Sequence, residues 1–268
     1  MSKQTFLVLV LGIAVAGMVG LPQSAQAVPQ AFFQSGAIEL KYDNFETEAN
    51  TLGSTLSGVF HVTSITQGLT TVWTEGISDG TFLNGRFFAL TNSTGPVPAG
   101  GGFDISFTGG KFEIYNVLVP LAPNGVTNGF ADLTEVCPPT GICPASWLTG
   151  DFVPGIVPGS ATTTLFSHVN AATLPLTGDG SGHLAVTGGT VASLFNSNGL
   201  ANGADLLLKS SLCTPGISGC TPSNGLGYSL VSHDPVSGSV VPEPASLLLL
   251  GSGLVGLAAW RRRSITRS

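Results

Sequence analysis

The chain has 268 residues, of which 9% are charged, and its formal net charge is −6. An average soluble protein carries about 25% charged residues, so this low value together with 37 glycines argues against a helical cytosolic enzyme. A hydrophobic content of 43% is enough to build a core, which argues against a disordered polymer, and the acidic balance excludes nucleic acid as a partner because no basic patch can displace counterions.

The N-terminus predicts a secretory signal peptide. Lys3 precedes an apolar run over residues 6–19, and a small-residue site, Ala25-Gln26-Ala27, follows the run. Fourteen residues are short for a permanent membrane span, which takes about 20 residues. We therefore expect signal peptidase to remove residues 1–27 during export.

Two segments predict β-hairpins. Apolar and polar side chains alternate through residues 103–108 and again through residues 111–115, and Gly109-Gly110 lies between them. A Gly-Gly loop allows the positive φ angles of a tight turn, so these two strands are predicted to pair. The same pattern around Gly188-Gly189 predicts a second hairpin over residues 184–192.

The exported domain, residues 28–233, is predicted to be all-β. Further strands are predicted by short alternating or β-branched runs between turn residues, at residues 37–42, 58–65, 70–75, 81–91, 165–171, 204–210 and 228–232. Residues 94–102 and 138–158 are rich in Pro and Gly and predict long loops. Because no helical run is long enough to connect parallel strands, we expect an antiparallel β-sandwich, for which the jelly roll is one arrangement.

Four cysteines form two close pairs along the chain, Cys137 with Cys143 and Cys213 with Cys220. An exported protein meets an oxidising compartment, and short loops rich in Pro and Gly allow local closure, so we expect one disulfide within each pair. Zinc is the competing interpretation, but its paired ligands usually have about two to four intervening residues, whereas these pairs have five and six. The spacing favours disulfides, and we expect no metal and no cofactor.

Signatures of the common hydrolases, metalloproteases and nucleotide-binding enzymes are absent from the sequence. Ser232-His233-Asp234 contains the residue types of a catalytic triad, but neighbours along one extended segment cannot meet in triad geometry. We therefore expect no enzymatic activity.

Acidic and aromatic residues leave two alternatives open. A glycan hydrolase would need paired carboxylates, for which the candidates are Glu39, Asp43, Glu46 and Glu48, although an acidic strand edge that resists aggregation explains them as well. A glycan-binding module would need an exposed aromatic ring. Trp147, in a predicted loop, is the candidate for this contact, whereas Trp73 lies inside a predicted strand and is expected in the core.

The C-terminus has a predicted flexible stalk, residues 234–241, followed by a tail in three parts. Pro242, Glu243 and Pro244 lead into residues 245–260, which carry no charge, and Arg261, Arg262 and Arg263 follow. Sixteen helical residues reach about 24 Å, which is marginal for a membrane core of about 30 Å, and the flanking residues close part of the gap. The tail therefore predicts a transmembrane helix whose arginine cluster stays cytoplasmic.

This three-part tail closely resembles the PEP-CTERM sorting signal of Gram-negative bacteria, and the resemblance covers residues 242–268 only. It implies recognition by an exosortase, a membrane-embedded cysteine transpeptidase, and cleavage near the Pro-Glu-Pro motif. It also implies a protein that is transiently anchored and then reaches the cell surface or the extracellular space, often in species that make biofilm or exopolysaccharide.

The resemblance and the missing catalytic motifs together predict a structural or adhesive protein of the extracellular matrix, with exopolysaccharide as a candidate partner. A glycan-binding module on the same scaffold is the first alternative, and a carboxylate-based glycan hydrolase is the second.

Overall fold

A computed structural model describes residues 33–170, 177–213 and 226–241, and these residues form an all-β, antiparallel structure, as predicted. The strands are β1 (Gly36–Glu46), β2 (Thr55–Gln67), β3 (Thr70–Thr74), β4 (Phe82–Asn92), β5 (Val97–Ala99), β6 (Gly102–Val117), β7 (Ser146–Val153), β8 (Leu165–Asn170), β9 (Thr177–Gly188), β10 (Leu206–Cys213) and β11 (Leu230–Val240). The helical turns are α2 (Gly125–Asn128), α3 (Leu133–Val136), α4 (Ala192–Phe195) and the 3-10 turn η2 (Ala201–Gly203).

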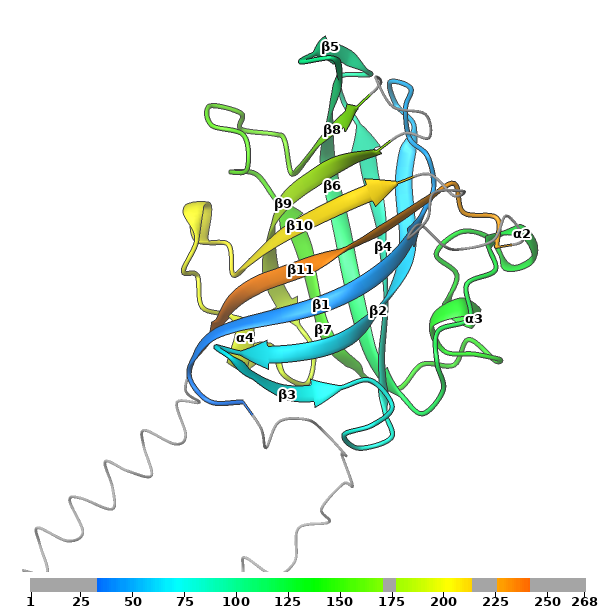
Figure 1. The fold of residues 1–268 in the computed structure, drawn as a ribbon, viewed down its shortest axis with the longest axis vertical. Coiled ribbons are helices and arrows are strands. Elements are labelled where there is room, and N and C mark those ends of the chain that lie inside the picture. Colours follow the sequence, from blue (N-terminus) through cyan, green and yellow to red (C-terminus); the bar gives the residue numbers. More distant parts are fainter. Residues whose placement is uncertain (1–32, 171–176, 214–225, 242–268) are drawn as a thin grey trace, which may run out of the picture.

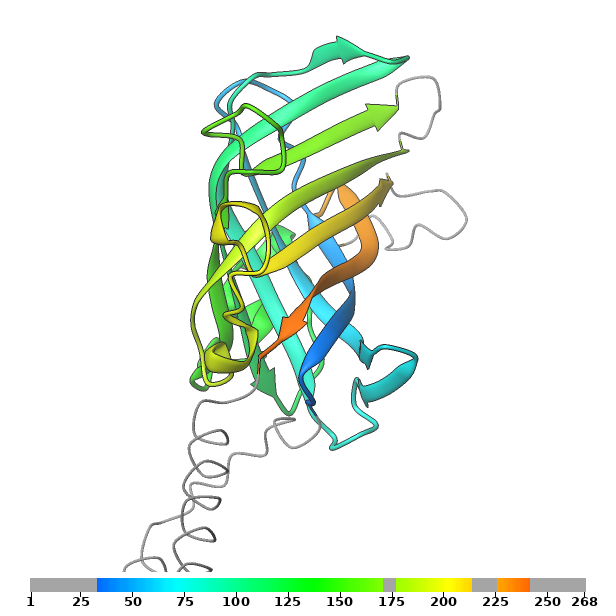
Figure 2. The same cartoon turned by 90° about the vertical axis from the view of Figure 1, so that its left-hand side faces the viewer.

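The strands form one sheet that closes on itself. Hydrogen-bonded neighbours follow the order β1-β11-β10-β9-β7-β6-β4-β2, and β1 pairs with β2 as well as with β11. Figures 1 and 2 show the result, a twisted cylinder with β3 attached beside β2. The expected sandwich is wrong, because a sandwich or jelly roll needs two separate sheets packed face to face, whereas here every strand of the ring is paired on both sides.

β7 and β8 occupy one place in this ring, one after the other. β6 pairs with β7 through residues 111–115 and with β8 through residues 102–107, and β9 makes the same two pairings in turn. Residues 154–164 leave the sheet between the two strands. β7 lies within residues 138–158, where the Pro and Gly content predicted only a loop, so this part of the prediction is wrong.

The seven strands predicted outside the hairpins are present as β1, β2, β3, β4, β8, β10 and β11. The ends of the predicted and observed strands differ most at β11. Residues 234–240 were predicted as a flexible stalk, but they continue this strand. Val240 lies opposite Gly36 of β1, and Val236 lies opposite Leu208 of β10. Pairing on both sides satisfies the backbone groups of this segment, so it belongs to the folded domain.

Both predicted hairpins are wrong. Gly109 and Gly110 do have positive φ angles, 72° and 103°, but β6 continues through them and the chain does not reverse. They form an irregular point opposite Ala89 of β4, whose φ is 60°, and such points bend a strand. Gly188 ends β9, and the residues after Gly189 lead into α4.

One end of the cylinder is plugged by aromatic side chains. Trp147 and Phe195 have ring centroids 5.5 Å apart, and Phe33 lies 5.8 Å from Phe195. α4, which carries Phe195, lies at this end, and β5 lies at the opposite end (Figure 1). The backbone N–H of Val241 donates to Leu194 O over 2.8 Å, so the last described residue of the chain also lies at the plugged end.

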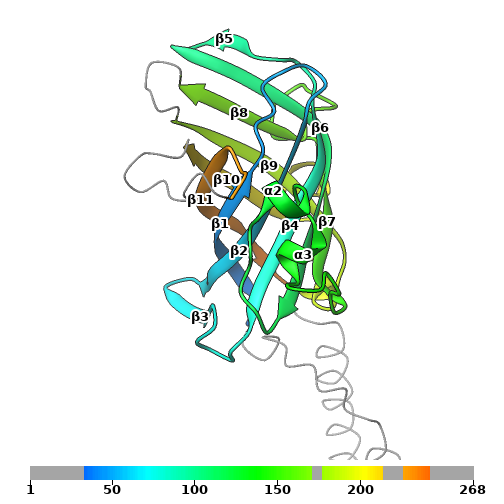
Figure 3. The same ribbon diagram turned by 90° about the vertical axis from the view of Figure 1, so that its right-hand side faces the viewer.

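The segment 118–145, which carries α2 and α3, packs on the outside of the cylinder beside β2 and β4 (Figure 3). Its anchor is Glu135, a buried residue whose carboxylate accepts a hydrogen bond from the Tyr228 hydroxyl over 2.7 Å. The predicted disulfide between Cys137 and Cys143 is confirmed in this segment, with an S–S distance of 2.04 Å.

Gly110→Ala is expected to lower the free energy of unfolding by about 2 kcal/mol or more. The new Cβ would lie 2.6 Å from Leu90 Cδ2, and the φ of 103° strains any residue with a side chain. Gly180→Ala is the matched control, because the nearest heavy atom to its Cβ would be Ser210 Cβ at 3.6 Å. Denaturant unfolding of both variants checks this, and equal losses would contradict it.

Candidate functional site

The lumen of the cylinder contains a cavity of about 130 Å³. One water molecule takes about 30 Å³ in the liquid, so the cavity is large enough for part of an organic ligand. Its wall is mainly apolar and comes from strands on all sides of the ring, and its members include Leu40, Val62, Phe112, Phe152, Leu184 and Leu206.

The two ends of this lumen differ. The aromatic plug closes one end, whereas the lining at the other end includes Glu48 and Asn50, which are exposed. These two residues follow β1 in a loop that is fixed by Asn92, whose side-chain amide donates to Ala49 O over 2.8 Å. The lumen therefore reaches the surface at the end away from α4 and Val241.

A polar spot interrupts the apolar wall near the open end. Asn44 and Glu46 project inward from β1, and Ser232 lies directly opposite Asn44 on β11. Asn44 Oδ1 and Ser232 Oγ are buried, and both side chains interact with the Glu46 carboxyl, although neither oxygen has a partner at full hydrogen-bond geometry in the described part of the chain. Burial raises the pKa of Glu46 to about 7, and the neighbouring Ser232 and Asn44 side chains oppose the shift.

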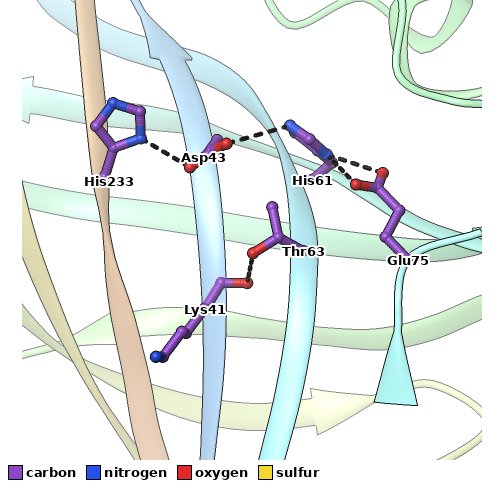
Figure 4. Close-up of polar contacts among 6 residues, drawn as sticks. All are labelled: Lys41, Asp43, His61, Thr63, Glu75 and His233. Carbon is purple, nitrogen blue, oxygen red and sulfur yellow. Dashed lines mark hydrogen bonds and ion pairs between the residues drawn. The ribbon is translucent and has the colours of Figure 1, made fainter. Parts of the chain in front are cut away.

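On the outer face, four ionisable side chains form a row across neighbouring strands (Figure 4). Asp43 Oδ1 of β1 lies 2.7 Å from His233 Nδ1 of β11, and Asp43 Oδ2 lies 3.8 Å from His61 Nε2 of β2. His61 Nδ1 lies 2.8 Å from a carboxylate oxygen of Glu75, just after β3. The row is a chain of hydrogen bonds and ion pairs across the outer face. Among the described residues, no group of three or more His, Cys, Asp or Glu side chains is arranged to hold a metal ion.

The four candidate carboxylates do not form one site. Glu39 and Asp43 lie on the outer face of β1, whereas Glu46 projects inward and Glu48 lies at the open end of the lumen. Because side chains alternate along the strand, the four carboxylates lie on two sides of the wall. They do not share one cleft of the kind that a glycan hydrolase needs.

Trp147 is not the exposed ring that was predicted. It is 1% exposed, because β7 lies between β6 and β9 and directs the side chain into the aromatic plug. It therefore offers no face to a glycan. Trp73 is in the core, as predicted, and is 0% exposed.

The polar spot was missed at the sequence level, although a signal was present. In β1, the even-numbered positions from Ile38 to Glu46 point inward and alternate with outward-facing residues. Asn44 and Glu46 therefore lie on the same face as Ile38. Only closure of the sheet turns that face into a lumen, and Ser232 is brought to it by a pairing with no local signature.

Several predicted residues lie outside the described residues. They are the signal peptide, Cys220 and hence the second disulfide, the sorting residues Pro242, Glu243 and Pro244, the predicted helix 245–260, and Arg261, Arg262 and Arg263. Within the residues that the structure describes, no helix is long and apolar enough to cross a membrane.

Comparison with known families identifies one match, the PEP-CTERM protein-sorting motif, over residues 240–263. The match confirms that the tail, and only the tail, resembles this family. The chain thus carries the signal of an exported protein that an exosortase system sorts. Comparisons with curated proteins and with solved structures give no match.

The stability of the fold is expected to fall as the pH rises from 4.5 to about 7. In this window the unfolded chain releases the Glu46 proton while the folded protein retains it, so ionisation costs roughly 3 kcal/mol in the folded state by the upper end of the window. Denaturant unfolding across this range measures the slope.

Glu46→Gln has no carboxyl to ionise at this position and is expected to reduce that slope, leaving the smaller contribution of Glu135, whose pKa is also raised by burial. Glu39→Gln, on the outer face of the same strand, is the matched control and should keep the wild-type slope. An unchanged slope in Glu46→Gln would contradict the assignment.

Proposed function

We propose that the exported domain is a non-catalytic binding module that holds an apolar small molecule inside its closed sheet. The observation that carries this proposal is the apolar cavity of about 130 Å³, plugged at one end and lined by exposed residues at the other. Small-molecule sites are commonly concave and mostly apolar, with a few polar groups that orient the ligand. The lumen has each of these properties.

The sorting motif supports a place for this module at the cell surface. We propose that residues 245–260 hold the chain in the membrane before an exosortase processes it near Pro242. Because Val241 lies at the plugged end, the attachment point is at the base of the cylinder and the open end of the lumen faces away from it.

A structural or adhesive role in the extracellular matrix is the second candidate function, and a different observation favours it. The segment 118–145 carries large apolar side chains with high exposure: Leu118 at 78%, Val126 at 68%, Phe130 at 51% and Ile142 at 80%. Several exposed apolar side chains within one surface segment favour a contact surface there. This segment, rather than the buried Trp147, is where contact with a matrix component such as exopolysaccharide would be sought.

Uptake of the fluorescent apolar probe N-phenylnaphthylamine tests the binding function. The exported protein, purified from cells that produce the full-length chain, is expected to bind the probe and increase its fluorescence. Gly180 lines the cavity, and a Cβ added there would be in ordinary van der Waals contact, 3.6 Å from Ser210 Cβ. Gly180→Leu should therefore fill part of the lumen and weaken binding at least about tenfold.

Ser181→Leu is the matched control, because the neighbouring position on β9 faces outward and should leave uptake unchanged. Unfolding curves establish that both variants fold. Absence of uptake by the folded wild-type protein, or equal uptake by the Gly180→Leu variant, would refute the proposal.

Intact mass of the cell-bound and released fractions tests the proposed surface sorting. A released form that begins at Val28 and ends near Pro242 is expected. A chain that keeps Arg261–Arg263 in the membrane fraction, with no released form, would show an ordinary anchored protein instead.

A further inference from the structure

The polar spot of the lumen has hydrogen-bonding capacity that the described protein uses only in part, through the Glu46 carboxyl. Asn44 Oδ1 and Ser232 Oγ belong to residues that are 6% and 0% exposed, and neither atom has a partner at full hydrogen-bond geometry in the described residues. The two residues are directly opposite in the β1–β11 register, so their side chains lie on the same face of the sheet. Buried polar atoms are nearly always paired. The Glu46 carboxyl on the same face interacts with both side chains, and a ligand in the cavity would supply the partners that remain.

The chemistry of this spot selects a head group that donates hydrogen bonds. The amide oxygen of Asn44 only accepts, and the hydroxyl of Ser232 both donates and accepts. The carboxyl of Glu46 lies two residues further along the same face of β1 and accepts when it is ionised. All three can accept from a protonated primary amine, which has three N–H donors, whereas an alcohol hydroxyl donates to one of them and can accept from Ser232.

The charge of the lumen favours a cation over an anion. Among the described lining residues the carboxyl groups are those of Glu46 and Glu48, and none of the lining residues is Lys, Arg or His. The residues opposite Glu46 are Leu230 on β11 and Gly58 on β2, which carry no charge. A carboxylate head group would therefore meet like charge in an apolar surrounding, where repulsion is stronger than in water.

Two other titratable groups line the lumen among the residues whose side chains the structure describes. The Tyr42 hydroxyl donates to Lys209 O over 2.7 Å, and Glu48 lies exposed at the open end. Because burial raises the pKa of Glu46 to about 7, its carboxylate is fully available to a cation only above that pH. Preference for an amine is therefore expected to strengthen from pH 6 to pH 8.

The position of the spot orients the ligand. Asn44 and Glu46 lie toward the open end of β1, whereas Leu40 and Ile38 lie toward the plug. A head group seated at the spot would direct an alkyl chain along the apolar wall.

We propose that the lumen binds a single-chain amphiphile whose head group donates hydrogen bonds to Asn44, Glu46 and Ser232, with a primary amine preferred over an alcohol and an alcohol over a carboxylate. The inference rests on the proposed binding function and names its ligand class. The apolar part of the cavity holds part of the alkyl chain, and the head group binds the polar atoms near the open end.

Competition against bound N-phenylnaphthylamine tests the ranking. Decylamine, decanol and decanoate share one chain length and differ in the head group. With the exported protein at pH 8, decylamine is expected to displace the probe at a concentration at least about tenfold lower than decanoate, with decanol between them.

Glu46→Gln should reduce the preference for decylamine to the level of decanol, and Ser232→Ala should weaken both donors while leaving decanoate unaffected. Asp43→Asn, on the outer face of β1, is the matched control and should keep the wild-type ranking. If Glu46→Gln does not fold, Ser232→Ala and the wild-type ranking still decide the matter.

The outcomes separate this inference from the proposed function. Probe uptake with equal displacement by all three compounds, or with decanoate the strongest, would overturn the head-group assignment and leave apolar binding intact. Failure of the folded protein to take up the probe would overturn both.

Discussion

The double pairing of β1 is the constraint on which the rest of the structure depends. This strand hydrogen-bonds to β2, which follows it along the chain, and to β11, the last strand described. Without the second pairing the sheet would be open, with β1 and β11 as exposed edges. With it, the sheet has an inside and an outside, and each alternating strand sends one set of side chains to each.

β1 itself illustrates what closure does to neighbouring residues. Asp43 points outward and joins the row of histidine and carboxylate side chains across the wall, whereas Asn44 and Glu46 point into the lumen. Three residues of nearly adjacent sequence thus enter two different environments. Water can solvate the outer row, but the inner groups have only the apolar wall and each other, which is why the Glu46 carboxyl keeps its proton to higher pH.

The sequence predicted most of the strands but not how they pair, for a physical reason. Alternation is a property of a few consecutive residues, so most strands could be predicted and the inward face of β1 could be read from its pattern. The short spacing of Cys137 and Cys143, six positions apart, indicated their disulfide. Closure depends on pairings between distant segments, and nothing local distinguishes a cylinder from a sandwich. Gly109-Gly110 has the angles of a turn but bends a continuous strand, and Trp147 appeared exposed only because β7 was not recognised.

The extension of β11 to Val240 also determines where the folded domain ends relative to the sorting motif. A flexible stalk would have let the domain rotate freely. Instead, a single residue, Val241, separates the last paired position from Pro242, and the backbone N–H of Val241 donates to Leu194 of α4. The folded domain therefore continues to the residue before the sorting motif, and the open end of the lumen lies on the far side of the cylinder from that residue.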